Sequence, residues 1–286
     1  MSDVLVTATE LRDALAAGRF ADGGPVRVLD VRWRLDRPDG RPEYLAGHIP
    51  GAQYVDLDHD LAAHGEPTEG RHPLPPVEAL REVARRWGID DGDTVVVYDD
   101  LKNLSSARAW WLLRYAGVAD VRLLDGSLRA WTDAGFEVES GDAVAPAPGS
   151  VTLAYGALPV LPLEDVPGFA DGSLLLDARA GERYRGEVEP IDPRAGHVPG
   201  AVSAPTTENV GADGRFHDPE ALRERFAALG AAPGAEVGVY CGSGVTAAHQ
   251  AVALTLAGFM PRVFLGSWSQ WSNHPELPVA TGPEPR

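Results

Sequence analysis

The chain has 286 residues, of which 44% are hydrophobic, so it can bury a core large enough for two domains of ordinary size. Its formal net charge of −17 excludes a general affinity for nucleic acid, whose phosphates would repel it, but leaves room for a locally positive pocket that binds a small anion. The single cysteine excludes an internal disulfide and suits a reducing compartment.

Residues 1–139 alternate short apolar runs with segments of helical periodicity. Three runs are short, β-branched and bounded by Gly or Asp, and are predicted to be buried strands: Arg27–Val31, Thr94–Tyr98 and Val121–Leu124. Two segments between them have the apolar spacing of helices: Pro76–Trp87 and Ser105–Ala116. This order predicts an α/β fold, a mostly parallel sheet covered by helices on both faces. The loops after the strands then share one edge, where such folds place their sites.

Residues 140–160 are predicted to be a linker over the surface, because Ser140–Ser150 is rich in Pro, Gly and Ala and lacks periodicity. The alternation of strands and helices then resumes in residues 161–286. Its predicted strands are Leu174–Leu176, Glu236–Tyr240 and Arg262–Leu265, and its predicted helices are Pro219–Leu229 and Thr246–Ala257.

The two halves repeat each other. Four motifs recur in the same order, roughly 140–150 residues apart: Val28–Arg32 with Leu175–Arg179, Gly47–Ala52 with Gly196–Ala201, Val97–Asp99 with Val239–Cys241, and Leu124–Ser127 with Phe264–Ser267. A duplication explains this order, and chance does not. We therefore predict two tandem domains of one α/β fold, residues 1–139 and 161–286.

The chemical centre of the sequence is the loop Tyr240-Cys241-Gly242-Ser243-Gly244-Val245-Thr246, between a predicted strand and a predicted helix. Glycines let the backbone approach a ligand closely, and successive N–H groups in such a turn form a nest for an anion. The positive end of the following helix favours a thiolate. The alternative is a small buried hydrophobe, but the position at this edge of the sheet predicts that Cys241 is a nucleophile.

Two motifs resemble the signatures of the rhodanese family of sulfurtransferases: Tyr44–Ala52 the N-terminal one and Phe264–Trp268 the C-terminal one. The loop that begins at Cys241 is similar to that of 3-mercaptopyruvate sulfurtransferases, whereas thiosulfate sulfurtransferases usually carry Cys-Arg-Lys-Gly-Val-Thr. The resemblance covers nearly the whole chain and implies two rhodanese-like domains, of which only the second is catalytic. Asp99, at the cysteine position of the first copy, agrees, because a carboxylate cannot accept a sulfane sulfur.

The resemblance also implies site residues outside the loop. Arg183 and Arg194 match two arginines that bind the carboxylate and carbonyl of the donor, although the spacing around Arg194 departs from the family. Asp58 and His72 in the first copy match an Asp and a His of the family's site. The alternatives are surface salt bridges for the arginines and an ordinary loop histidine for His72, and Asp56 stands close to Asp58.

Within the loop, Ser243 is predicted to hydrogen-bond the thiolate or relay a proton, with a purely structural loop serine as the alternative. Gly242, Gly244, Val245 and Thr246 are predicted to line the substrate site with their backbone N–H groups.

Four further residues are predicted to be structural. His48 and His197 occupy the paired signatures of both copies, so each is expected to hold its loop to the aspartate that ends the preceding strand motif. Trp268 and Trp271 are expected to pack in the core.

Together these features predict a ping-pong sulfurtransferase. The Cys241 thiolate attacks the sulfur of 3-mercaptopyruvate, pyruvate leaves, and the persulfide passes its outer sulfur to a thiol, such as thioredoxin, or to cyanide. No metal or organic cofactor is expected, since the histidines lack ligand spacing and cysteine partners.

Three alternatives remain. The first is a thiosulfate sulfurtransferase with the same nucleophile, and the second is a non-catalytic sulfur-binding or regulatory module. A cysteine phosphatase is disfavoured, because Ala247 stands where its phosphate-binding arginine belongs. Mercaptopyruvate is the expected donor, since Gly242 and Ser243 offer dipoles where the thiosulfate-type loop has two cations.

The sequence also bears on the compartment. Met1–Val4 shows no start of a signal peptide, and no run reaches the roughly 18 apolar residues of a membrane span, so a cytoplasmic protein is expected.

Overall fold

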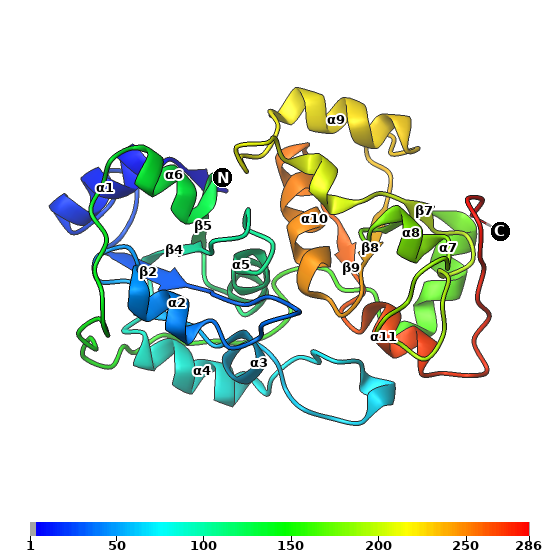
Figure 1. The fold of residues 1–286 in the computed structure, drawn as a ribbon, viewed down its shortest axis with the longest axis horizontal. Coiled ribbons are helices and arrows are strands. Elements are labelled where there is room, and N and C mark those ends of the chain that lie inside the picture. The colour runs from blue at the N-terminus through cyan, green and yellow to red at the C-terminus, as the bar shows by residue number, and fades with distance from the viewer. Residues whose placement is uncertain (1–3, 286) are drawn as a thin grey trace. The chain divides into compact units, whose positions relative to one another are not determined.

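The computed structural model describes residues 4–285, which form two compact units (Figure 1). The sheet of unit 1 has five strands in the order β1-β5-β4-β2-β3, and every pairing is parallel. Its strands are β1 Leu5–Val6, β2 Val26–Asp30, β3 Gln53–Tyr54, β4 Thr94–Tyr98 and β5 Asp120–Leu124. Its helices are α1 Ala8–Ala17, α2 Arg41–Ala46, α3 Leu57–Asp60, α4 Val77–Arg86, α5 Ser106–Tyr115 and α6 Ser127–Asp133.

The sheet of unit 2 has four parallel strands in the order β7-β6-β8-β9. Its strands are β6 Leu174–Asp177, β7 Val202–Ser203, β8 Val237–Tyr240 and β9 Arg262–Val263. Its α-helices are α7 Val166–Gly172, α8 Gly181–Tyr184, α9 Pro219–Ala228, α10 Val245–Leu256 and α11 Ser267–Ser272. Three 3₁₀ turns add Pro67–Glu69, Leu163–Asp165 and Thr206–Asn209.

The predicted α/β architecture is confirmed, with every predicted strand and helix present to within about two residues at each end. Prediction missed the ten-residue helix α1, several shorter helices and the two-residue strands β1, β3 and β7. A strand of that length has no readable alternation, so its place in the sheet depends on the neighbouring strand.

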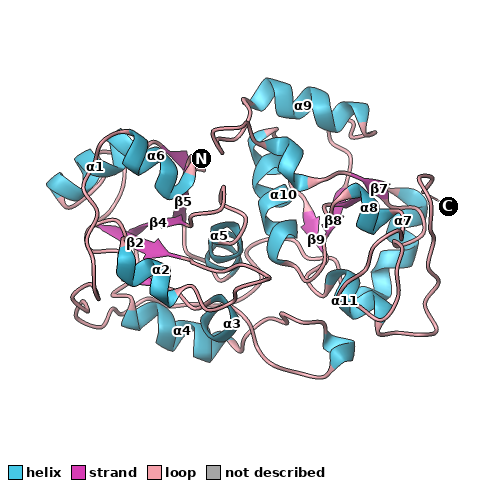
Figure 2. Ribbon diagram, in the orientation of Figure 1, coloured by secondary structure: helices cyan, strands magenta, loops and turns pink. Residues whose placement is uncertain are grey.

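Helices cover both faces of each sheet (Figure 2). In unit 1, Val96 and Tyr98 of β4 pack with Leu11 of α1 and Trp131 of α6. The alternate residue Val97 points to the opposite face and is also fully buried. Burial of both faces explains why the central strands read as continuous apolar runs.

The core of unit 2 repeats this arrangement. Tyr240 of β8 packs with Phe169 of α7 and with both tryptophans of α11, Trp268 and Trp271. The predicted packing role of these two tryptophans is confirmed.

The two units exchange short segments, whereas the predicted domains were continuous stretches. Residues 63–74 belong to unit 2, and residues 212–215 belong to unit 1. Within unit 2 the first exchanged segment is held by polar contacts: the Arg71 N–H donates to Ser269 Oγ at 3.1 Å, and His274 Nε2 lies 3.1 Å from the carbonyl oxygen of Thr68. No local pattern signals such an exchange, because its partners are distant in the sequence.

The predicted linker is largely part of unit 1, to which residues 140–157 belong. The N–H of Gly149 donates to the Arg85 carbonyl at 2.8 Å, and that of Val151 donates to the Ile89 carbonyl at 3.1 Å. Val151 is buried. Backbone hydrogen bonds therefore hold this segment to the rest of unit 1.

The signature of each copy is anchored by an aspartate–arginine–tyrosine set. In unit 1, Arg32 binds Asp30 through two nitrogens, at 2.7 and 3.0 Å, and also donates to the Gly47 carbonyl at 2.8 Å. Tyr98 hydrogen-bonds Asp30 and accepts the N–H of Ile49 at 2.9 Å. Burial raises the pKa of Asp30, opposed by Arg32. The set thus ties the loop after α2 to the end of β2.

The signature histidines do not bind these aspartates, so the predicted partner was wrong. His48 Nδ1 lies 3.0 Å from the Tyr44 carbonyl oxygen, and His197 Nδ1 lies 2.8 Å from that of Tyr184. Each ring stacks on its tyrosine, with centroids 4.1 and 3.8 Å apart. Both histidines are fully buried, which supports the structural role predicted for them.

Asp99 fills the loop that corresponds to the cysteine loop. Its carboxylate accepts four backbone N–H groups, from Leu101, Asn103, Ser105 and Ser106, at 2.7–3.0 Å, and two hydroxyls, from Ser106 and Ser127, at 3.0–3.2 Å. The first copy therefore keeps an anion-binding turn but occupies it with its own side chain.

Asp99→Asn is expected to destabilise the protein by about 2–4 kcal/mol, because the amide turns an –NH₂ donor toward groups that donate. Chemical denaturation measures the loss. Asp100→Asn is the matched control, since its carboxylate makes only a 3.3 Å pair with Arg34. Equal stability of the two variants would contradict the assigned role of the Asp99 carboxylate.

Candidate active site

The cysteine loop joins β8 to α10 in unit 2. Gly244 caps α10 in the left-handed conformation, φ +81°, and turns its N–H toward Cys241 Sγ at 3.1 Å. The thiol side chain is therefore held at the N-terminus of a twelve-residue helix, where the backbone favours negative charge. Cys241 is 1% exposed.

The N-terminus of α11 holds the loop from the other side. Ser267 Oγ accepts the N–H of Cys241 at 3.1 Å, while the N–H groups of Trp268 and Ser269 donate to the carbonyls of Cys241 and Gly242 at 3.0 and 2.8 Å. In unit 1 the N–H of Leu128 binds the Asp99 carbonyl in the same way. The loop is thus fixed on both sides, which orients the cysteine.

Ser243 of the cysteine loop forms a pair with His72. Ser243 Oγ lies 2.8 Å from His72 Nδ1, and both residues are buried. His72 reaches Ser243 because residues 63–74 belong to unit 2. Asp58 lies in the first turn of α3 in unit 1, and its role in the site stays a prediction.

Two arginines lie against the loop at Gly242. A Cβ at this residue would lie 3.2 Å from Arg71 Nη2 and 3.4 Å from Arg183 Nη1. Gly242 therefore provides room for two guanidinium groups, while only Gly244 needs the left-handed conformation. Arg183 lies in the last turn of α8, and Arg71 lies in the exchanged segment, residues 63–74.

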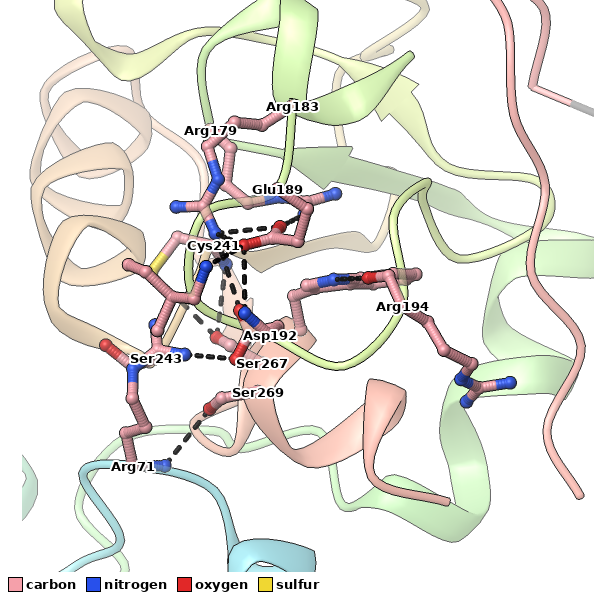
Figure 3. Close-up of polar contacts among 12 residues, drawn as sticks. Arg71, Arg179, Arg183, Glu189, Asp192, Arg194, Cys241, Ser243, Ser267 and Ser269 are labelled. Atoms are coloured by element: carbon pink, nitrogen blue, oxygen red, sulfur yellow. Dashed lines mark hydrogen bonds and ion pairs between the residues drawn. The ribbon is translucent and has the colours of Figure 1, made fainter. Parts of the chain in front are cut away.

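Two buried carboxylates accompany these arginines (Figure 3). Arg183 Nη2 donates to both oxygens of Glu189, at 2.6 and 2.9 Å, and lies 3.4 Å from Asp192 Oδ2. Arg71 Nη1 pairs with the other oxygen of Asp192. Burial raises the pKa of Asp192, and Arg71 opposes this effect. The loop is therefore flanked by two cations and two anions.

Arg179 belongs to the scaffold behind this cluster. It binds Asp177 at 2.6 Å, donates to the Gly196 carbonyl at 2.7 Å, and lies over the Trp268 ring at 4.6 Å. Burial is the largest single effect and lowers the pKa of Arg179, but Asp177, Tyr240 and Glu189 together outweigh it, so the pKa is raised. This is the same anchoring set as in unit 1.

Arg194 does not face the cysteine, which argues against its predicted role as a substrate anchor. Its guanidinium donates to the carbonyls of four residues at 2.7–2.9 Å: Trp271, Ser272, His274 and Leu277. Figure 3 shows it pointing away from the cysteine loop. A guanidinium satisfied in this way caps the C-terminal end of α11 and has little capacity left for a ligand.

The residues that sequence reasoning missed are Arg71, Glu189 and Asp192. Arg71 directly precedes His72, so the resemblance led to the correct segment but not to the arginine. Its partner Asp192 is 121 residues away, and no pattern in the sequence links the two.

Within residues 4–285, no three or more His, Cys, Asp or Glu residues group as ligands for a metal ion. In the same part of the chain, no helix combines the length and apolar character needed to cross a bilayer.

Comparison with known proteins places this geometry in a family. The rhodanese-like domain model matches twice, at residues 7–134 and 167–274. A Mycobacterium tuberculosis protein provisionally named a thiosulfate sulfurtransferase is 48% identical, with 98% of this chain and 97% of the relative covered. A Pseudomonas aeruginosa protein named a probable 3-mercaptopyruvate sulfurtransferase is 47% identical, with 89% and 92% covered.

Solved structures agree. A crystal structure of SseA from Escherichia coli, described as a 3-mercaptopyruvate sulfotransferase of rhodanese fold, superposes with a TM-score of 0.80 at 32% identity, covering 93% of this chain and 99% of that one. An anaerobic ergothioneine biosynthesis enzyme from Chlorobium limicola gives a TM-score of 0.84 at 26% identity, with 98% and 70% covered. The double match, the tandem parallel sheets and the cysteine loop show that the chain belongs to the rhodanese-like domain family.

Proposed function

We propose that this chain is a sulfurtransferase that moves a sulfane sulfur from 3-mercaptopyruvate through a persulfide on Cys241 to an acceptor. The observation that carries the proposal is the placement of Cys241 Sγ, which receives the Gly244 N–H at the N-terminus of α10 while two arginines flank the next residue. A nucleophile and an anchor for an anion are thus adjacent, as this chemistry requires.

The first half-reaction follows from these positions. As the Cys241 sulfur bonds to the donor sulfur, the donor's carbon–sulfur bond breaks and its electron pair goes to carbon as the enolate of pyruvate. That carbon needs a proton, and the donor's S–H group must lose one as its sulfur is transferred to Cys241. The Ser243–His72 pair is placed to relay this proton. Arg183 holds the donor carboxylate, and Arg71 assists in place of Arg194.

In the second half-reaction the outer sulfur goes to a nucleophile. A thiol such as that of thioredoxin, or cyanide, attacks it and restores the Cys241 thiolate. The backbone N–H groups of Gly244, Val245 and Thr246, at the start of α10, stabilise the charge on the persulfide. A lone cysteine that must remain reduced between turnovers supports a cytoplasmic location.

Thiosulfate is the second candidate donor, because Arg71 and Arg183 supply from outside the loop the two cations that the loop itself lacks. The 48%-identical relative named for that activity also favours it.

The test compares kcat/KM for the two donors on the purified protein, with cyanide as the acceptor. Intact mass spectrometry with donor alone should show one added sulfur on Cys241, which the acceptor removes. Mercaptopyruvate is expected to be preferred, by roughly ten- to a thousandfold. Comparable use of both donors would support the thiosulfate alternative, and a persulfide without turnover would indicate a sulfur-binding module.

A further inference from the structure

We infer that Glu189 and Asp192 determine donor specificity: they neutralise the two arginines beside Gly242, so that the site favours a singly charged sulfur donor over a dianion such as thiosulfate. This inference rests on the proposed function and names the class of donor that the same site accepts.

The charges around Gly242 balance. Arg71 and Arg183 contribute two positive charges, and Glu189 and Asp192 contribute two negative ones. Arg179 lies 3.5 Å from Glu189, but Asp177 already binds it, so it adds no net charge to the cluster. An arriving anion therefore meets oriented donors without an excess of positive charge.

Burial makes this balance effective. The side chains of Glu189 and Asp192 are each 3% exposed, so water screens them far less than it screens surface carboxylates. The nearest other carboxylate of the segment, Glu187, is 56% exposed and pairs with Arg185 at 2.8 Å. Within this segment, the buried pair rather than Glu187 is therefore placed to influence the charge of a ligand at the loop.

The arginines keep capacity for one small anion. Arg183 gives Nη2 to both carboxylates, whereas its Nη1 is the nitrogen that lies beside Gly242. Arg71 likewise gives Nη1 to Asp192, and its Nη2 lies beside Gly242. A donor carboxylate can thus bind without displacing Glu189 or Asp192, but a second negative charge finds no cation left to match it.

A pocket lies against the Arg71–Asp192 side of this cluster. It measures about 370 Å³, and Arg71 and Asp192 are part of its wall, together with residues such as His64, Pro67 and Ile191. Either donor is small enough to enter, so size does not make the choice between them. Charge is the difference between the donors on which Asp192, at this wall, can act.

The test removes one negative charge at a time with shape-matched variants, Asp192→Asn and Glu189→Gln. A dianion gains twice what a monoanion gains from losing a nearby negative charge, so the ratio of kcat/KM for thiosulfate to that for mercaptopyruvate is the measure. Each variant is expected to raise this ratio about tenfold, as one unit charge at a partly screened distance implies. Glu187→Gln, on the same segment, should leave the ratio unchanged.

Calorimetric titration with sulfate and with acetate gives a second readout that needs no turnover. Each variant should tighten sulfate binding relative to acetate binding about tenfold. If one variant does not fold, the other decides, because both remove a charge from one cluster. Unchanged ratios in both readouts for a folded variant would overturn the inference. If the wild-type protein transfers sulfur from neither donor, the proposed function fails, and the sulfate titration still decides the charge argument.

Discussion

Cys241→Ser is expected to lower sulfur transfer from either donor by about a thousandfold or more, the usual scale for loss of a catalytic nucleophile. A serine hydroxyl stays protonated near neutral pH and cannot form a persulfide. The chain has no second cysteine that could substitute. Initial rates with mercaptopyruvate and with thiosulfate, together with intact mass after donor treatment, measure the effect.

The substitution should leave the fold intact, because serine is close in size to cysteine and can still accept the Gly244 N–H. The melting temperature is therefore expected to stay near that of the wild-type protein. A folded Cys241→Ser protein that keeps more than a few per cent of the activity would refute the assignment of the nucleophile.

Arg183→Ala is expected to lower kcat/KM for mercaptopyruvate by about a hundredfold. A charge-assisted contact to a desolvated carboxylate is worth a few kcal/mol, and its loss also leaves Glu189 and Asp192 facing the donor with less compensation. For the same reason the loss should be larger for thiosulfate. Arg183→Lys keeps the charge but not the planar fork, so it should recover only part of the activity.

Kinetics with both donors and thermal melting separate binding from stability in these variants. Arg185→Ala is the matched control, because Arg185 is two residues away and makes an exposed pair with Glu187. Activity in Arg183→Ala equal to that of the control would place the donor's anchor elsewhere, with Arg71 as the next candidate.

The sequence alone determined the duplicated α/β fold and predicted the nucleophile. Both can be recognised from short stretches of chain. Apolar runs of strand length indicate β4 and β8, and the glycines around Ser243 indicate the loop that connects a strand to a helix. Asp99 likewise identified the first copy as lacking a nucleophile. Such features are local because backbone conformation depends mainly on neighbouring residues.

Only the tertiary structure decided which charged side chains surround the loop. An arginine has a long, flexible side chain, so its position in the sequence does not say where its guanidinium lies. Arg194 stands near the family's position yet caps the end of α11, whereas Arg71 reaches Gly242 because residues 63–74 fold into unit 2. The burial of Glu189 and Asp192 against these arginines, and with it the charge of the site, follows from that packing.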